Sequence, residues 1–186
     1  MKKYLAKNGL FQLLVVLVAI GFYSMAQAQL VNVNVQVQLD GDQKKLEVTT
    51  RGQCSNDNHN GCIHVRKGTQ ARINFSFVGN PQCNRPGGVS WEIGEVYLGG
   101  KGSMSKPGGW GGLDAQVQAD FSVADAASGR LNKGAGSNKR SIVISNNNKN
   151  AYDIWYKVTA VCVNDSGSTV GVPAETDPRI KNGGAD

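Results

Sequence analysis

Alternation of apolar and polar residues is the dominant pattern of the chain, and its longest instance spans residues 151–163. A strand points successive side chains to opposite faces, so every second residue of this segment shares a face. One of the two faces is apolar throughout: Tyr152, Ile154, Tyr156, Val158, Ala160 and Cys162. The other face, from Asp153 to Val163, mixes polar and apolar residues. The segment therefore predicts a core strand that carries a cysteine near its end.

Shorter alternating runs predict strands along the rest of the chain. The first, at residues 31–39, alternates valine and leucine with asparagine and glutamine, which is typical of a half-buried strand. The turn signal at residues 40–42 and the run that follows it predict a hairpin with a return strand at residues 46–50. Further strands are expected at residues 63–66, 71–77, 89–93, 96–98, 115–123, 141–144 and 168–172.

Several connections can also be predicted. Gly68 marks a turn between residues 63–66 and 71–77, and these two runs form the clearest hairpin of the chain. Gly94 interrupts an alternating run and indicates a β-bulge. One short helical turn is expected at residues 123–128. Short, regularly spaced strands without a long amphipathic helix predict an all-β fold, an antiparallel β-sandwich of the Ig-like or cupredoxin-like Greek-key type. A β-barrel is the alternative.

Residues 1–28 have the composition of a secretory signal peptide. Three lysines precede an apolar run at residues 10–23, and Ala26, Gln27 and Ala28 supply the small residues of a signal-peptidase site. The apolar run is short for a hydrocarbon core of about 30 Å, and no cysteine stands at the cleavage point. We therefore expect cleavage before Gln29, a single β-sandwich domain over residues 29–186, and a periplasmic or secreted location. An uncleaved N-terminal anchor is the alternative.

Removal of this segment changes the charge argument. The whole chain has 20 basic and 14 acidic residues and a net charge of +6. Three of the basic residues are lysines of the segment, so 17 basic and 14 acidic residues remain, with a net charge of +3. That balance is ordinary for a soluble domain, and no clustered basic stripe indicates a nucleic-acid partner.

All four cysteines, Cys54, Cys62, Cys83 and Cys162, lie in the part of the chain that we expect to be exported. An even number of cysteines in an oxidising compartment predicts two disulfides. A four-cysteine zinc site is the alternative, but it needs closely spaced cysteine pairs, which the chain lacks. A bond from Cys54 to Cys62 would close the polar loop between them and leave Cys83 to pair with Cys162. Other pairings stay open.

His59 and His64 are the only histidines, so a histidine-dependent reaction would have to use one of them. We expect His64 on the wet face of its strand, and a surface histidine is the simpler interpretation. A blue-copper site needs two histidines, one cysteine and usually an axial methionine gathered together. Cys162 has no histidine after it, and all four cysteines are expected in disulfides, which argues against copper.

Other motifs in the loops lack the residues or the secondary structure that their chemistry requires. Residues 56–61 resemble the first half of a calcium-binding loop, but the only carboxylate there, Asp57, is out of register. Residues 103–106 match the Ser-x-x-Lys pattern of penicillin-recognising enzymes without the helix that the pattern requires. No spacing singles out a pair of carboxylates for glycoside chemistry. We therefore predict no catalytic residue, no metal and no cofactor.

Met104 and Trp110 are the best candidates for a ligand-binding site. They are the large apolar residues of a glycine-rich loop at residues 99–112. Exposed aromatic groups on loops are typical of ligand contacts. The alternative is that the two side chains cap the open end of the sandwich.

Two segments resemble known bacterial proteins. The sequence Thr-Asp-Pro-Arg-Ile at residues 176–180, after the core strand with its tyrosines, is similar to the Asp-Pro-x-Ile ending of small bacterial proteins grouped as the DP-EP family. Residues 63–77, turned at Gly68, resemble an early hairpin of cupredoxin-type domains. The resemblance implies a cupredoxin-like or Ig-like sandwich. It departs from the copper-binding members because the ligand set is missing, and it implies no activity.

These observations together predict an exported, non-enzymatic β-sandwich protein of a bacterial envelope with a binding or structural role. The sequence does not specify the ligand; a surface protein or a glycan fits this interpretation. A fimbrial or surface-assembly subunit is the first alternative, in which the strand from Val31 to Leu39 would complete a neighbour's sheet. A small secreted hydrolase that uses His59 or His64 is the second.

Overall fold

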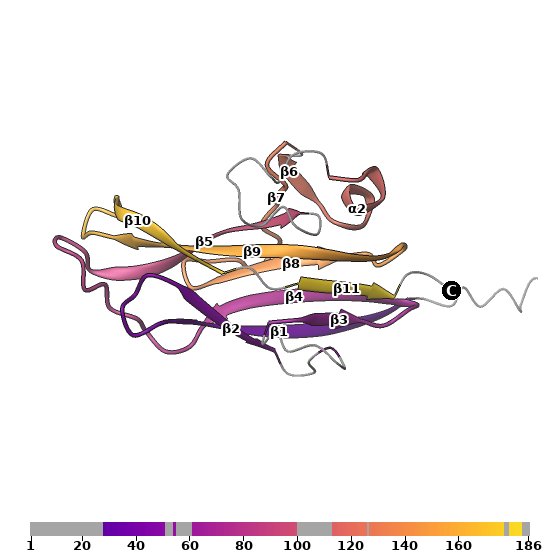
Figure 1. Cartoon of the computed structure of the whole chain (residues 1–186), viewed down its shortest axis with the longest axis horizontal. Coiled ribbons are helices and arrows are strands. Elements are labelled where there is room, and N and C mark those ends of the chain that lie inside the picture. Colours follow the sequence, from indigo (N-terminus) through magenta and orange to yellow (C-terminus); the bar gives the residue numbers. More distant parts are fainter. Residues whose placement is uncertain are drawn as a thin grey trace, which may run out of the picture.

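Figure 1 shows the computed structural model of the chain, which describes residues 28–50, 54, 61–99, 113–125, 127–176 and 179–183. The described elements are, in chain order, β1 (Gln29–Leu39), β2 (Leu46–Thr50), β3 (Ile63–Val65), β4 (Thr69–Phe77), β5 (Ser90–Gly99), α2 (Ala115–Asp120), β6 (Val123–Asp125), β7 (Arg130–Leu131), β8 (Ser141–Asn146), β9 (Ala151–Val163), β10 (Thr169–Thr176) and β11 (Arg179–Gly183). Within this part of the chain, no helix has the length and apolar character needed to span a membrane.

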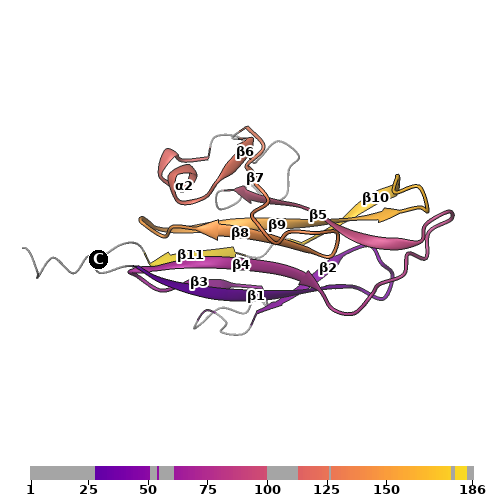
Figure 2. The same cartoon turned by 180° about the vertical axis from the view of Figure 1, so that it is seen from behind.

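The strands form two sheets that pack face to face. The small sheet has the order β2-β1-β4-β8, and the large sheet has the order β3-β11-β9-β5-β7-β6, with β10 paired to the second half of β9. Inward-pointing residues of both sheets form one hydrophobic core. Figures 1 and 2 show α2, β6 and β7 together on the side of β9 that faces away from β1 and β4. β6 and β7 end the large sheet, and Phe121, just after α2, bridges to Asn146 of β8. The predicted all-β sandwich is therefore confirmed.

The sheets are mixed rather than purely antiparallel, contrary to expectation. β1 runs parallel to β4, and β3 runs parallel to β11. β11 is itself an element that the pattern missed, because Ile180 is its only apolar residue; that side chain is fully buried. Alternation determines the face that a residue occupies, but not which strand lies beside it or in which direction that strand runs.

The hairpin predicted at residues 63–77 is wrong. β3 belongs to the large sheet and β4 to the small sheet, so the chain crosses between the sheets at the intervening turn. Thr69 closes that turn by donating its backbone N–H and its hydroxyl to the carbonyl of Arg66, and Gly68 has a positive φ of 73°. The Asn148 side chain donates to the carbonyls of Arg66 and Thr69. Both strands are apolar on their inward faces, so alternation alone is compatible with either arrangement.

The strand predicted at residues 115–123 is also wrong, because most of that segment forms the helix α2. Asp114 caps the helix by accepting a hydrogen bond from a backbone N–H of the first turn. Val117 and Phe121 lie four residues apart and are both buried, a spacing that suits one helix face. The apparent alternation depended on two alanines, and alanine favours helix over strand.

Other expectations agree with the structure, with one further exception. β1 and β2 form a hairpin, β10 pairs back along β9, and the apolar face of β9 is buried from Ile154 to Cys162. The pairing of β5 with β9 shifts register around Gly94, as expected for a bulge. A Cβ atom at Gly94 would lie 2.6 Å from the hydroxyl oxygen of Thr159, which explains the glycine. The helical turn predicted at residues 123–128 is wrong, since β6 begins that segment.

Both predicted disulfides are present. Cys54 bonds to Cys62, and Cys83 bonds to Cys162. The second bond joins residues 79 positions apart, and both of its cysteines are buried. On the chain-entropy model, closing so long a loop stabilises the fold by about 4–5 kcal/mol, against about 2–3 kcal/mol for the shorter link. Two disulfides suggest an oxidising, extracellular or periplasmic setting.

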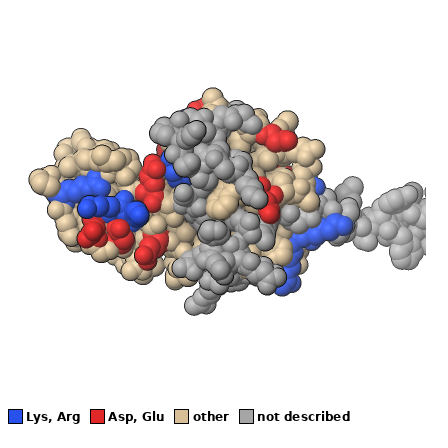
Figure 3. All heavy atoms as spheres, viewed as in Figure 1, with Lys and Arg blue, Asp and Glu red and all other residues tan. Residues whose placement is uncertain are grey.

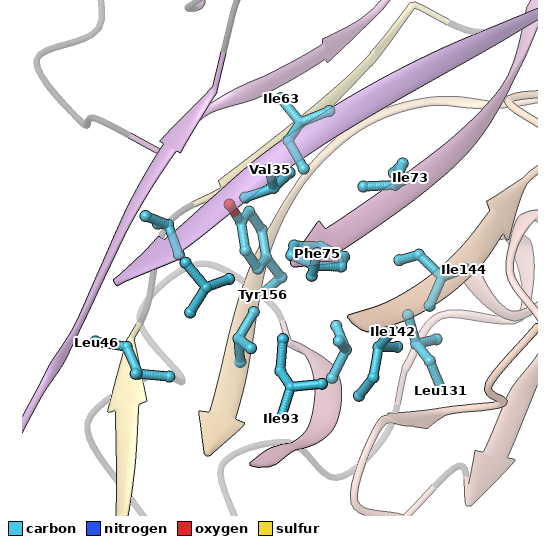
Figure 4. Packing of buried hydrophobic residues seen from close by; sticks show 14 of the residues in the cluster. Val35, Leu46, Ile63, Ile73, Phe75, Ile93, Leu131, Ile142, Ile144 and Tyr156 are labelled. Carbon is cyan, nitrogen blue, oxygen red and sulfur yellow. The ribbon is translucent and has the colours of Figure 1, made fainter. Parts of the chain in front are cut away.

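Tyr156 of β9 lies at the centre of the core. Its side chain is fully buried, and its ring packs at a tilt of 59° against the ring of Phe75 on β4, with 5.3 Å between centroids. Figure 4 shows this ring pair between the strands of the two sheets, surrounded by aliphatic side chains. The hydroxyl of Tyr156 donates to the carbonyl oxygen of Gly61 at 2.6 Å. One side chain therefore joins the two sheets and anchors the segment that leads into β3.

Burial raises the pKa of Tyr156 well above its ordinary value of 10.0. Above about pH 10 the unfolded chain loses this proton while the folded chain keeps it. The stability that depends on neutral Tyr156 is thus complete below that pH and falls above it, by up to about 1.4 kcal/mol per pH unit. We expect Tyr156→Phe to remove this alkaline loss and to cost about 1–2 kcal/mol at neutral pH through the lost hydrogen bond.

Chemical denaturation of both proteins at about pH 7 and about pH 11 measures these effects. Groups that titrate in both proteins cancel in the comparison. An equal alkaline loss of stability in the wild type and in Tyr156→Phe would contradict the expectation.

Candidate functional site

The outward side of the small sheet, which we call the polar face, is the strongest candidate site. It carries the residues that alternate with the buried ones along β1, β4 and β8. On β1, Val35 and Val37 are fully buried, whereas Asn34 and Gln36 beside them are exposed. The same strands therefore supply the core and the polar face.

Strand register arranges the polar face in rows that cross the sheet. The first row joins Asn32, Arg72 and Ser145; the second joins Asn34, Asn74 and Val143; the third joins Thr49, Gln36, Ser76 and Ser141. Neighbouring strands of a sheet lie about 5 Å apart, whether they run parallel or antiparallel. Amide and hydroxyl groups consequently lie side by side across these rows, with one guanidinium group among them.

Two shallow grooves cross this face and share Asn34. The larger groove has a volume of about 430 Å³ and is lined by Asn32, Asn34, Arg72, Asn74, Gly136, Ser141 and Val143. The smaller groove has a volume of about 290 Å³ and is lined by Asn34, Gln36, Thr49, Thr50 and Ser76. Asn34 lines both grooves, so they lie next to each other on β1.

One wall of the larger groove is formed by the segment that precedes β8. The N–H of Gly134 donates to the carbonyl of Val143 at 2.7 Å, and the N–H of Val143 donates to the Ser137 hydroxyl at 3.0 Å. Arg72 donates through Nη2 to the carbonyl of Ala135 at 2.6 Å. These bonds hold the segment against the edge of the sheet and position the guanidinium group in the wall.

Asn74, beside this groove, carries a buried acceptor. Its Oδ1 atom has no hydrogen-bond partner among the residues that the structure describes. An unsatisfied buried polar atom costs about 1–3 kcal/mol, and native structures retain few of them. Asn74 also lines the larger groove, but this oxygen is buried, so the groove meets other atoms of the residue.

Arg72 is the only ionisable residue among the described residues that line the two grooves. Acid–base catalysis needs side chains such as His, Asp, Glu, Cys or Lys, and a serine or threonine nucleophile needs such a base beside it. Shifted pKa values, which often mark reactive sites, belong to other described residues. Hydrogen bonds lower the pKa of Asp40 and of Asp125, and burial raises the pKa of Tyr97. Amide and hydroxyl groups predominate among the described residues of the two grooves.

The large sheet presents a charged surface instead. Ion pairs join Lys139 to Glu92 at 2.8 Å and Lys157 to Glu175 at 3.2 Å. Figure 3 shows basic and acidic side chains side by side at the end of the molecule where β10 lies. Charges of both signs are interspersed there, so this surface does not select strongly for an anionic or a cationic partner.

The structure bears on only some of the candidates that the sequence suggested. Met104, Trp110 and His59 lie outside the described residues. His64 is exposed on β3, as a surface histidine is expected to be. Cys162 is bonded in a disulfide and so cannot supply a copper thiolate. Groups of three or more His, Cys, Asp or Glu that could hold a metal are absent from the described ranges.

Sequence reasoning placed the candidate site in a loop that lies outside the described residues, and it did not single out the polar face. The signal was the run of asparagines and glutamines that alternates with the valines of residues 31–39. This run indicated the solvent-exposed side of a strand. It did not indicate a site, because Arg72 and Asn74 lie beside it only through the parallel pairing of β1 with β4.

Comparison with known proteins adds no assignment. No protein-family model matches the chain, and no curated protein matches it. The function therefore has to be argued from the chemistry of the site.

Gly136 shapes the wall of the larger groove. Its φ is +91°, and a Cβ atom there would lie 2.8 Å from Nη2 of Arg72. We expect Gly136→Ala to lower the free energy of unfolding by about 1–3 kcal/mol and to displace the guanidinium group from Ala135. Gly167→Ala is the matched control, because its φ of +78° brings the same kind of backbone strain while nothing lies within 4 Å of its added Cβ, and it should show only that backbone cost of about 1 kcal/mol. Urea denaturation compares the two variants; equal effects would contradict the packing described for this wall.

Proposed function

We propose that this protein is an exported, non-enzymatic binding protein that holds a neutral, hydroxyl-rich ligand such as a glycan chain on its polar face. The composition of the two grooves carries the proposal. Their described lining consists mainly of amide and hydroxyl side chains, with one guanidinium group and no carboxylate. Such a lining can form many hydrogen bonds but supplies little charge.

Side-chain amides suit a hydroxyl-rich ligand. Each asparagine or glutamine offers two N–H donors and a carbonyl acceptor, and each serine or threonine hydroxyl both donates and accepts. Sugar hydroxyls have the same dual character, and neutral groups cost less to desolvate than charges. A net contribution of about 0.5–1.5 kcal/mol per hydrogen bond makes a handful of such bonds consistent with a Kd of about 1 mM.

Other ligand classes fit the polar face less well. Small apolar ligands favour pockets lined by hydrophobic and aromatic side chains, and the described lining contains no aromatic residue. The centres of protein interfaces are likewise enriched in aromatic residues, methionine and arginine. An anionic ligand would depend on Arg72, whose guanidinium already bonds to Ala135.

Export is part of the proposal. The two disulfides favour an oxidising compartment. The lysines, the apolar run and the alanines of residues 1–28 support a cleaved signal peptide, which would release a chain that begins at Gln29 into a periplasm or the exterior. The polar face would there meet the glycans of an envelope or its surroundings.

The surface-assembly alternative has less support. A donor strand has to leave its own fold to complete a neighbour's sheet. β1 pairs with β4 over residues 29–37 and with β2 from Val35 to Leu39, and its residues Val35 and Val37 are fully buried in its own core. This position supports the interpretation of β1 as the first strand of the sandwich. The resemblance to the DP-EP family stays a prediction.

Titration of residues 29–186 with neutral oligosaccharides of glucose, xylose, mannose and galactose tests the proposal by calorimetry. We expect a subset of them to bind with a Kd that changes little with salt, because few charges take part. Asn34→Ala removes the residue that both grooves share and should weaken binding by about 5- to 10-fold. Gln38→Ala removes an exposed amide of the same strand outside both described linings and should leave binding unchanged. Failure of every sugar to bind, or an equal loss in both variants, would contradict the proposal.

A further inference from the structure

One edge of the small sheet is open along the first half of β1. On one side, β1 pairs with β4 over residues 29–37. On the other side it pairs with β2 only from Val35 to Leu39. Among the described residues, residues 29–34 therefore have no neighbouring strand on that side, and such an edge is a template for pairing with another strand.

The open edge arises because β2 ends early. Its last residue, Thr50, lies opposite Val35 and donates its hydroxyl to the carbonyl of Cys62 at 2.8 Å. Cys62 directly precedes β3, which belongs to the large sheet. Thr50 is thus bonded to the segment that enters the other sheet, and β2 stops short of the start of β1.

Burial along β1 reflects the missing neighbour. Val35 and Val37, in the part that β2 accompanies, are 0% exposed. Val31 and Val33 pack against the same core but remain partly exposed, and Leu30 is 60% exposed. A further strand on this edge would cover the side of the core that these residues leave open.

Other edges of the sandwich carry features that hinder strand addition. At β8, the N–H and C=O of Val143 are already bonded to the preceding segment. At β10, the pairing with β9 shifts register, and the Arg85 guanidinium bonds to the carbonyls of Val170 and Val172. Residues 29–34 contain no charge and no proline, and their pairing with β4 has no register shift, so the usual protections of an edge strand are missing.

We propose that residues 29–34 pair antiparallel with the same residues of a second copy of this protein across a two-fold axis. Such an axis makes the two partners contribute the same patch. With Asn32 opposite its own counterpart, Val31 lies opposite Val33 on the core side of the joined sheet. The half-buried valines of each copy then cover those of the other. No side chain of the segment is charged, and the α-amino group that cleavage would create at Gln29 lies opposite Val35 of the other copy, away from its own counterpart, so like charges do not face each other.

The expected dimer is weak and reversible. A single pair of short strands buries less than the surface of about 1,600 Å² that is standard for a stable protein interface. The dimer uses the edge of the sheet and needs no ligand. The test of the dimer is therefore independent of the test of glycan binding.

Sedimentation velocity of residues 29–186 over a concentration series tests the association, and hydrogen exchange locates it. We expect the average mass to rise from monomer toward dimer, with the amides of residues 29–34 gaining protection as concentration increases. A monomer at every concentration would overturn the proposal. So would protection of residues 29–34 that does not change with concentration, or a dimer whose new protection lies elsewhere.

Val31→Lys makes the test specific to the edge. In the monomer the new ammonium can reach solvent through the open edge, whereas in the dimer it would be trapped among apolar side chains. Association should weaken by about 100-fold as a result. Gln38→Lys adds the same charge to β1 where β2 covers the edge, and it should leave association unchanged. Equal dimerisation of these two variants would overturn the proposal.

Leu30→Lys provides a second test if Val31→Lys proves unstable. Leu30 is 60% exposed, so its replacement leaves the core intact. The two-fold pairing would place both new charges within the joined edge, and association should weaken by about tenfold. Unchanged association in Leu30→Lys would contradict the pairing.

Discussion

The contact between Tyr156 and Phe75 is the interaction on which the two-sheet arrangement depends most directly. These residues lie on β9 and β4, interior strands of the large and the small sheet, and both are fully buried. Loss of an aromatic ring from a packed core costs about 3–5 kcal/mol, a large part of the 5–15 kcal/mol that separates most folded domains from their unfolded state. The hydrogen bond from the Tyr156 hydroxyl to the Gly61 carbonyl also positions the chain, because it holds the segment before β3 against the same side chain.

This constraint also determines the polar face. Phe75 can meet Tyr156 only if its strand places residues 73, 75 and 77 inward, and the intervening Arg72, Asn74 and Ser76 are then outward. A slip of one residue in β4 would exchange the two sets. A change in the register of these strands would therefore alter the core and the polar face together. The residues of the polar face lie on strands whose inward side is closely packed.

How far the sequence could predict this structure follows from what alternation encodes. It was sufficient for β9, whose apolar face is buried as expected, and for the hairpin of β1 and β2. It was insufficient for the partners of β3 and β4, because apolar inward faces fit a hairpin or a crossing between sheets equally well. The helix α2 was missed because alanines are compatible with the two-residue repeat of a strand and with the 3.6-residue repeat of a helix. The signal that favours the helix is a single capping residue, Asp114. The polar face depends on a parallel pairing between distant segments, which no local pattern contains.

Chemical-shift mapping of isotopically labelled protein during addition of a bound neutral oligosaccharide tests the polar face most directly. Asparagine side chains give their own amide signals, so the residues of the grooves can be observed individually. The largest shifts are predicted for Asn32, Asn34 and Asn74, with smaller changes along the neighbouring backbone of β1 and β4. Shifts concentrated on the large sheet, with these three side chains unchanged at saturation, would contradict the assignment of binding to this face.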